Sequence, residues 1–215
     1  RTLRQNIQQF KDYYLGGTLA VLAVAALIIY MVSRFLAPEK KADLTVAIFD
    51  TDLSEDARKE MEEAVREAAG LPQDAVIAID SGYVSSNTNE YTRLSLLSSN
   101  GQVDAVIAGR EAFAELAGFG YFKDLSRFLP KDMQSEYAGK IAAFAYESEA
   151  VAEDAQQNGE LESGEYPFGL SLEGSALWAS MTAASSVKPE GPIIGVILES
   201  ESDDHVLGLL RALMK

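Results

Sequence analysis

The hydrophobic pattern of this chain starts with one long apolar run, LGGTLAVLAVAALIIYMVS, which extends from Leu15 to Ser33 without a charged residue. At about 1.5 Å of rise per residue, a helix of this length matches the hydrocarbon core of a bilayer. A core helix of a soluble domain keeps a polar stripe, whereas this run is apolar all round. The pattern therefore predicts a transmembrane helix over residues 15–36, and not a buried core helix.

The surroundings of this run refine the prediction. Residues 1–14 place apolar side chains at helical spacing, which predicts an amphipathic juxtamembrane segment. No small-residue cleavage site follows the run before Arg34, which favours an uncleaved signal-anchor over a cleaved signal peptide. Within the run, Gly16, Ala20 and Ala23 share one face, where a partner helix could approach closely. Ordinary use of small residues in a membrane helix is the alternative.

After a charged linker at residues 37–43, short apolar runs alternate with helical patterns. Unbroken apolar runs of strand length predict strands buried on both faces at residues 44–49, 75–79 and 103–108. Helical patterns follow them at residues 55–69, 90–99, 110–117 and 125–129. Ser54 is expected to cap the first of these helices and Gly70 to end it.

The second half of the chain is less regular. It predicts extended segments at 141–146, 166–172 and 193–198, and helices at 176–184 and 203–215. Residues 147–165 contain seven acidic residues and no basic one, which predicts a solvated excursion. The whole alternation predicts an α/β fold, with residues 44–215 forming one mainly parallel sheet that helices cover on both faces.

Composition limits the chemistry of this domain. The chain has no cysteine, which excludes disulfides, thiolate metal sites and cysteine nucleophiles. From Leu44 onward it has 12 basic and 30 acidic residues. This strong acidity argues against binding nucleic acid, because neutralising phosphates requires clustered Lys and Arg.

The same composition bears on topology. Three Lys or Arg residues precede the apolar run and three closely follow it, so the positive-inside rule alone does not orient it. The acidic domain would be repelled by the anionic cytoplasmic leaflet, which favours a cytoplasmic N-terminus and an extracytoplasmic domain in the plasma membrane. An exported domain without cysteine fits a Gram-positive cell surface at least as well as a periplasm.

Three segments resemble one known family. Residues 103–132, VDAVIAGREAFAELAGFGYFKDLSRFLPKD, are similar to a segment of bacterial extracellular solute-binding proteins of the type 2 periplasmic-binding fold. Residues 166–178 and 192–215 resemble the family's return to the first lobe and its last strand and helix. Members that act as transport receptors usually have two lobes and roughly twice this length. The resemblance therefore implies one lobe on a membrane anchor, with a partner protein in place of the second lobe.

Ligand sites of open α/β sheets lie beyond the carboxyl ends of the strands. In this sequence those ends carry Asp50, Asp52, Ser81, Gly82, Tyr83, Gly109, Arg110 and Glu199. Arg110 opens a helix, where it could meet an anion, although a surface ion pair is the simpler role. Trp178, which follows Glu173, could stack on a sugar ring or pack against the sheet. We take Asp50, Asp52, Ser81, Tyr83, Gly109, Arg110, Glu173 and Trp178 as candidate ligand-binding residues.

Two motifs suggest catalysis but have simpler explanations. Asp50-Thr51-Asp52-Leu53-Ser54 resembles the first motif of haloacid-dehalogenase-like phosphatases, in which paired carboxylates hold Mg²⁺ and one attacks phosphorus. The partner Lys and second acidic cluster are not convincingly placed, so helix capping by Asp52 and Ser54 is the simpler interpretation. His205, the only histidine, lacks the companions of a zinc site or a catalytic triad.

These observations lead to one main hypothesis and two alternatives. We expect a non-enzymatic, single-pass membrane protein without cofactor or metal, whose domain is an interaction or accessory subunit of a membrane complex such as an ABC-type transporter. The first alternative is an anchored receptor for a small solute such as a sugar or peptide. The second is an Mg²⁺-dependent phosphatase that uses Asp50 and Asp52.

Overall fold

The computed structural model describes residues 15–36, 42–147 and 161–215. The predicted juxtamembrane segment at residues 1–14, most of the linker, and residues 148–160 of the acidic excursion lie outside the described residues. From Ala42 to Lys215 the chain forms one compact unit.

The long apolar run forms a single helix, α2 (Leu15–Leu36), of 22 residues. Its side chains are described for residues 20–31, and eight large ones among them are 50–69% exposed. Ala20 and Ala23 are also exposed, whereas the side-chain position of Gly16 is not described. Within the residues searched, which are the described ones, there is no helix both long and apolar enough to cross a membrane.

The domain is built on one six-stranded sheet with the order β2-β1-β3-β6-β5-β4 in the described part of the chain. Its strands are β1 (Leu44–Phe49), β2 (Ile77–Tyr83), β3 (Ala105–Ala108), β4 (Ile141–Tyr146), β5 (Gly164–Ser171) and β6 (Ile193–Val196). β1 pairs in parallel with both β2 and β3. The pairings of β6 with β3, of β6 with β5 and of β5 with β4 are antiparallel.

The α/β class is therefore confirmed, but the prediction of a mainly parallel sheet is wrong. Helical crossovers join β1, β2 and β3, and these are the parallel strands. The apolar run of β6 has the same character as that of β1, and a short buried run carries no information about strand direction. β6 enters the sheet between β3 and β5 and runs against both, which makes the sheet mixed.

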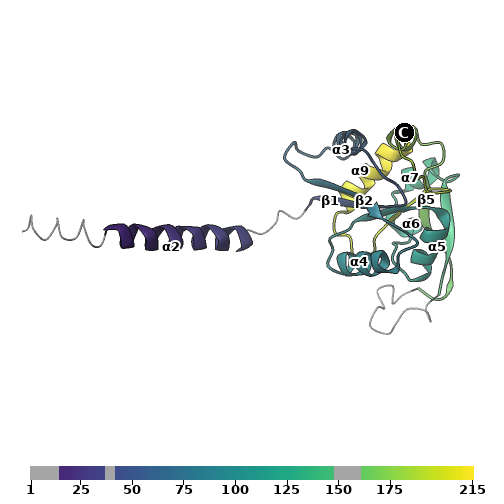
Figure 1. Cartoon of the computed structure of the whole chain (residues 1–215). Coiled ribbons are helices and arrows are strands. Elements are labelled where there is room, and N and C mark those ends of the chain that lie inside the picture. The colour runs from purple at the N-terminus through teal and green to yellow at the C-terminus, as the bar shows by residue number, and fades with distance from the viewer. Residues whose placement is uncertain (1–14, 37–41, 148–160) are drawn as a thin grey trace, which may run out of the picture. The chain divides into compact units, whose positions relative to one another are not determined.

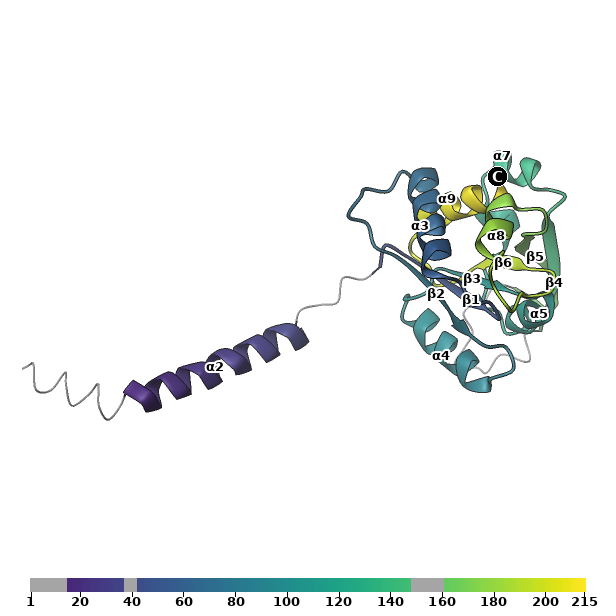
Figure 2. The same ribbon diagram turned by 45° about the horizontal axis from the view of Figure 1, so that its top comes forward.

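Helices cover both faces of the sheet, as the sequence predicts (Figures 1 and 2). The core on one face contains buried side chains from five helices: α3 (Glu55–Ala69), α6 (Leu125–Phe128), α7 (Lys131–Glu136), α8 (Ala176–Met181) and α9 (Asp203–Met214). α4 (Thr88–Ser99) and α5 (Arg110–Gly118) do so on the other face.

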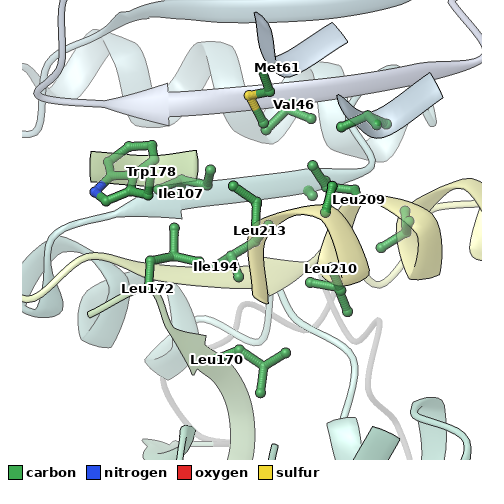
Figure 3. Packing of buried hydrophobic residues seen from close by; sticks show 14 of the residues in the cluster. Val46, Met61, Ile107, Leu170, Leu172, Trp178, Ile194, Leu209, Leu210 and Leu213 are labelled. Carbon is green, nitrogen blue, oxygen red and sulfur yellow. The ribbon is translucent and has the colours of Figure 1, made fainter. Parts of the chain in front are cut away.

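The larger core joins α3 and α9 to the sheet. Figure 3 shows Leu209, Leu210 and Leu213 of α9 among the side chains of this cluster, and the three are at most 1% exposed. The two helices approach closely at Gly208, where a Cβ atom would lie 2.2 Å from the Cβ of Ala69. Only a glycine fits at this crossing.

Local sequence signals predicted several helix and strand boundaries correctly. Ser54 caps α3, because its hydroxyl accepts a hydrogen bond from the Ala57 backbone, and Gly70 ends the helix with a φ of 64°. β1 and β4 have the predicted limits. β2 begins two residues later than predicted and continues through Ser81 and Tyr83, which were expected to lie beyond its carboxyl end.

Candidate functional site

A cavity of about 670 Å³ lies at the carboxyl ends of β1 and β3. We call it the carboxyl-end cavity. The loops after β1, β2 and β5, the start of α5 and the loop before β6 contribute its walls. Its lining residues are Asp50, Ser85, Gly109, Arg110, Glu111, Ala112, Ala114, Glu173, Lys188, Pro189, Glu190 and Gly191. Four of the candidate residues, Asp50, Gly109, Arg110 and Glu173, are thus brought together.

Asp50 holds the ends of β1 and β2 together at this cavity. Its Oδ1 accepts a hydrogen bond of 2.9 Å from the Ser85 backbone, and its own backbone N–H donates to the Tyr83 carbonyl at 2.9 Å. Asp50 is also the one residue other than glycine, in the described part of the chain, with a positive φ, of 51°. Asp tolerates this left-handed conformation better than most residues do.

The start of α5 forms the opposite wall. Gly109 precedes the helix, and the Arg110 backbone N–H donates to the Glu190 carbonyl at 2.9 Å. A Cβ at position 109 would lie 3.3 Å from that same carbonyl oxygen, so the loop before β6 packs tightly here. The Arg110 guanidinium lies 5.4 Å from the centre of the Phe144 ring, a cation–π arrangement.

The lining of the cavity is charged and predominantly acidic. Asp50, Glu111, Glu173 and Glu190 supply carboxylates, whereas Arg110 and Lys188 supply cations. None of the four carboxylates is within 4.0 Å of a Lys or Arg nitrogen in the ion pairs of the described residues. The cavity therefore offers carboxylates that are not neutralised by close partners.

Tyr91 of α4 lies outside the cavity lining, although the charges of Asp50 and Glu111 act on its phenol. Burial is the main cause that raises its pKa to about 12, and Glu115, Asp50 and Glu111 raise it further. Tyr91 therefore remains protonated at neutral pH. Sequence reasoning did not single out this residue.

Ser81 and Tyr83 have structural roles instead. Ser81 is 8% exposed, and its hydroxyl accepts a hydrogen bond of 3.0 Å from Arg58. Tyr83 is 2% exposed and packs on Phe49, with ring centres 5.1 Å apart. Burial is the main cause that raises the pKa of Tyr83 to about 12. Neither side chain lines the carboxyl-end cavity.

Trp178 and Asp52 also lie outside the cavity lining. Trp178 is 6% exposed and belongs to the core between the sheet and α3, α8 and α9, as Figure 3 shows. Of its two predicted roles, packing is the one that this position supports. Asp52 is exposed, and its backbone N–H donates to the Ser185 hydroxyl at 3.3 Å.

Glu199 was expected at the same end of the sheet, and this expectation is wrong. Because β6 is antiparallel to β3, residues after β6 lie at the amino ends of β1 and β3. There both Glu199 carboxylate oxygens are buried without a hydrogen-bond partner. Burial raises the pKa of this carboxyl, and its own backbone N–H and nearby Lys123 partly oppose the shift.

The reversal of β6 also explains why two residues of the cavity, Lys188 and Glu190, were not among the candidates. Both residues precede β6, whereas strand-end candidates in the sequence are residues that follow a strand. Because β6 is antiparallel to β3, the residues that precede β6 lie at the carboxyl end of β3. The sequence signal was the turn-rich stretch Pro189 to Pro192, but it becomes informative only when the direction of β6 is known.

The described residues contain no group of three or more His, Cys, Asp or Glu side chains able to hold a metal ion. Asp50 and Asp52 are not joined by a third acidic side chain. His205 lies near the start of β1, where its Nδ1 is 2.8 Å from the Asp43 carbonyl oxygen.

Comparison with known proteins gave no match: no protein-family model, no curated protein and no solved structure matched this chain.

Proposed function

We propose that this chain is a non-enzymatic, single-pass membrane protein whose extracytoplasmic domain is an interaction or accessory subunit of a membrane complex, such as an ABC-type transporter. The apolar surface of α2 carries the proposal, which concerns the whole helix Leu15–Leu36, whereas side chains are described only for residues 20–31. Eight large side chains, among them Leu22, Ile28 and Ile29, are at least half exposed along this helix. So much apolar surface is unfavourable in water and calls for lipid or another helix around it.

The domain's cavity supports a binding role. Its walls come from five different connections, and exposed carboxylates and cations line it. The resemblance of residues 103–132 to solute-binding proteins agrees with such a role, and a partner protein would supply the contacts that a second lobe makes in that family.

A second candidate function, an anchored receptor for a small solute, is favoured by the size of the cavity. About 670 Å³ lies within the range of small-molecule sites. The lining includes no aromatic residue, since Trp178 and Tyr83 are buried elsewhere. A sugar would lack a ring to stack on, which is why we rank a partner protein first. A rise in melting temperature with a sugar or a short peptide would support this second function.

Purification of the full chain from its native membranes in mild detergent tests the main proposal. We expect a membrane protein to co-purify at a fixed molar ratio and to remain bound through size exclusion. Recovery of the chain as an isolated monomer, with no membrane protein at a fixed ratio, would contradict it.

A further inference from the structure

The connection between β6 and α9, residues 197–202, contains a carboxyl group that is buried without a hydrogen-bond donor. Glu199 as a residue is only partly buried, but both of its carboxylate oxygens are shielded from solvent and have no hydrogen-bond partner. The groups that partly offset this burial are its own backbone N–H and the Lys123 ammonium, and neither is placed to donate a hydrogen bond to it. An ionised carboxylate is unfavourable in such a position, because a buried charge needs a close partner and hydrogen bonds.

Lys123 is already bound to other groups of the same connection. Its Nζ donates to the Ser200 carbonyl at 2.9 Å and pairs with the Asp203 carboxylate at 2.5 Å. In the ion pairs of the described residues, Lys123 lies within 4.0 Å of Asp203 and not of Glu199. A shift of the ammonium towards Glu199 would therefore weaken the contacts that hold residue 200 and the start of α9.

The connection packs over the amino ends of β1 and β3. Ser200 is 6% exposed, and its hydroxyl donates to Asp104 Oδ1 at 2.7 Å, while Asp104 Oδ2 accepts from the Thr45 backbone at 2.8 Å. The Leu198 backbone N–H donates to the Tyr121 carbonyl at 3.0 Å. Residues 198–202 themselves form a turn and a short irregular stretch. Such a segment can open without separating the strands of the sheet.

The other charges around the connection do not offer Glu199 a partner. Further titratable side chains border it: Asp104 beneath Ser200, Glu201 within it, and Asp203, Asp204 and His205 in the first turn of α9. His205 is directed elsewhere, because its Nδ1 lies 2.8 Å from the Asp43 carbonyl oxygen. Lys123 is thus the cation that acts on Glu199, and the Asp203 carboxylate already balances its charge.

We infer that the β6–α9 connection is a pH-dependent latch, closed while Glu199 is protonated and open, with Ser200 exposed to solvent, once Glu199 is ionised. The closed form keeps the carboxyl neutral and the open form hydrates it, so a rise in pH favours opening. The raised pKa of this carboxyl agrees with that direction. The latch is a property of the domain and does not depend on the proposed function.

Hydrogen exchange followed by mass spectrometry tests the latch on the full chain in mild detergent. The measurement is made at about pH 5 and about pH 8, with labelling times scaled for the intrinsic exchange rate. We expect the protection of amides in residues 198–202 to fall roughly tenfold at the higher pH, while residues 209–213 of α9 keep theirs. Unchanged protection of residues 198–202 would overturn the inference, because Lys123 would then have turned to Glu199 and kept the connection closed. An equal loss in residues 209–213 would also overturn it, because the whole domain would then open.

Two matched variants assign the effect to one carboxyl. Glu199→Gln has nearly the same shape and stays neutral, so its connection is expected to keep the same protection at both pH values. Glu201→Gln removes an exposed carboxylate two positions further along the same connection and is expected to behave as the wild type does. A loss of protection in Glu199→Gln equal to that of the wild type, or no loss in Glu201→Gln, would refute the assignment to Glu199.

Discussion

Asp50 and Ser85, 35 positions apart, are joined by a hydrogen bond of 2.9 Å from the Ser85 backbone to the Asp50 carboxylate. Because Asp50 also has a positive φ, its replacement tests the two features together. Asp50→Ala loses the acceptor and keeps the unfavourable φ, and we expect it to destabilise the domain by about 1–3 kcal/mol. Asp50→Asn keeps both features and is expected to remain within about 0.5 kcal/mol of wild type. Urea unfolding followed by circular dichroism measures both, and equal stability of the two variants would contradict this account.

Gly208 permits the close approach of α9 to α3 at Ala69. Gly208→Ala adds a methyl group where there is no room for it, and we expect a loss of about 1–3 kcal/mol despite the better helix propensity of alanine. Gly118→Ala is the matched control, because nothing lies within 4 Å of a Cβ at that position of α5. It is expected to be neutral or slightly stabilising. Thermal unfolding of both variants decides the matter, and a stable Gly208→Ala protein would show that the helices can move apart freely.

The proposed membrane anchor depends on the apolar character of α2. Val24→Asp combined with Ile28→Asp places two charges in its centre, and a charge there costs about 2.5–3.5 kcal/mol on insertion scales. We expect the wild-type chain to stay in the membrane pellet after extraction with alkaline carbonate, and the double variant to move to the supernatant. Leu96→Asp, at an exposed position of α4, is the control and should stay in the pellet. Release of the wild-type chain by carbonate would rule out an integral anchor.

The absence of cysteine allows a clean test of topology, because an introduced thiol is the only one in the chain. Ala138→Cys lies at an exposed position between α7 and β4. On intact cells, we expect it to react with a membrane-impermeant maleimide, whereas Thr2→Cys should react only after lysis. The reverse pattern would place the domain in the cytoplasm.

Glu199 makes stability depend on pH in a direction that follows from its burial. Its pKa is raised in the folded state above the ordinary value of 4.5, so the folded state holds the proton more tightly than the unfolded state. This contribution to stability is complete below pH 4.5 and is lost as pH rises through the folded-state pKa. Glu199→Gln keeps a neutral side chain, so we expect it to be more stable than wild type at pH 7 and similar to it near pH 4. Denaturant unfolding at the two pH values measures this difference. A difference that does not change with pH would mean that folding leaves the pKa of this carboxyl unshifted, which would contradict the prediction.

The sequence was most informative where a single local signal determined the structure. Ser54 and Gly70 marked the ends of α3, and short runs without a charged residue located β1 and β4. Strand direction is different, because it depends on how distant segments pair and not on the residues of one strand. This explains the error over β6, and it explains in turn why Glu199 was assigned to the wrong end and why Lys188 and Glu190 were missed.

The candidate site was predictable only in part for a related reason. The rule that ligands bind beyond strand carboxyl ends located Asp50, Gly109 and Arg110 around the cavity. The rule does not predict which side chains near a strand end point into the core, because their orientation depends on packing with residues far away in the sequence. Ser81 bonds to Arg58, and Trp178 fills the core under α3 and α9. A polar or aromatic residue near a strand end is thus as readily used by the core as by a ligand.

The position of β6 has a consequence for synthesis of the domain. It is the only strand that joins the pair β5 and β4 to the group of β1, β2 and β3 in the described sheet. While the ribosome has released only the residues before Ile193, the chain contains two groups of strands with no hydrogen bonds between them. Both groups then expose an unpaired edge, to which any extended segment could add. If the domain is exported as proposed, the interval before β6 emerges is when it most needs protection from aggregation.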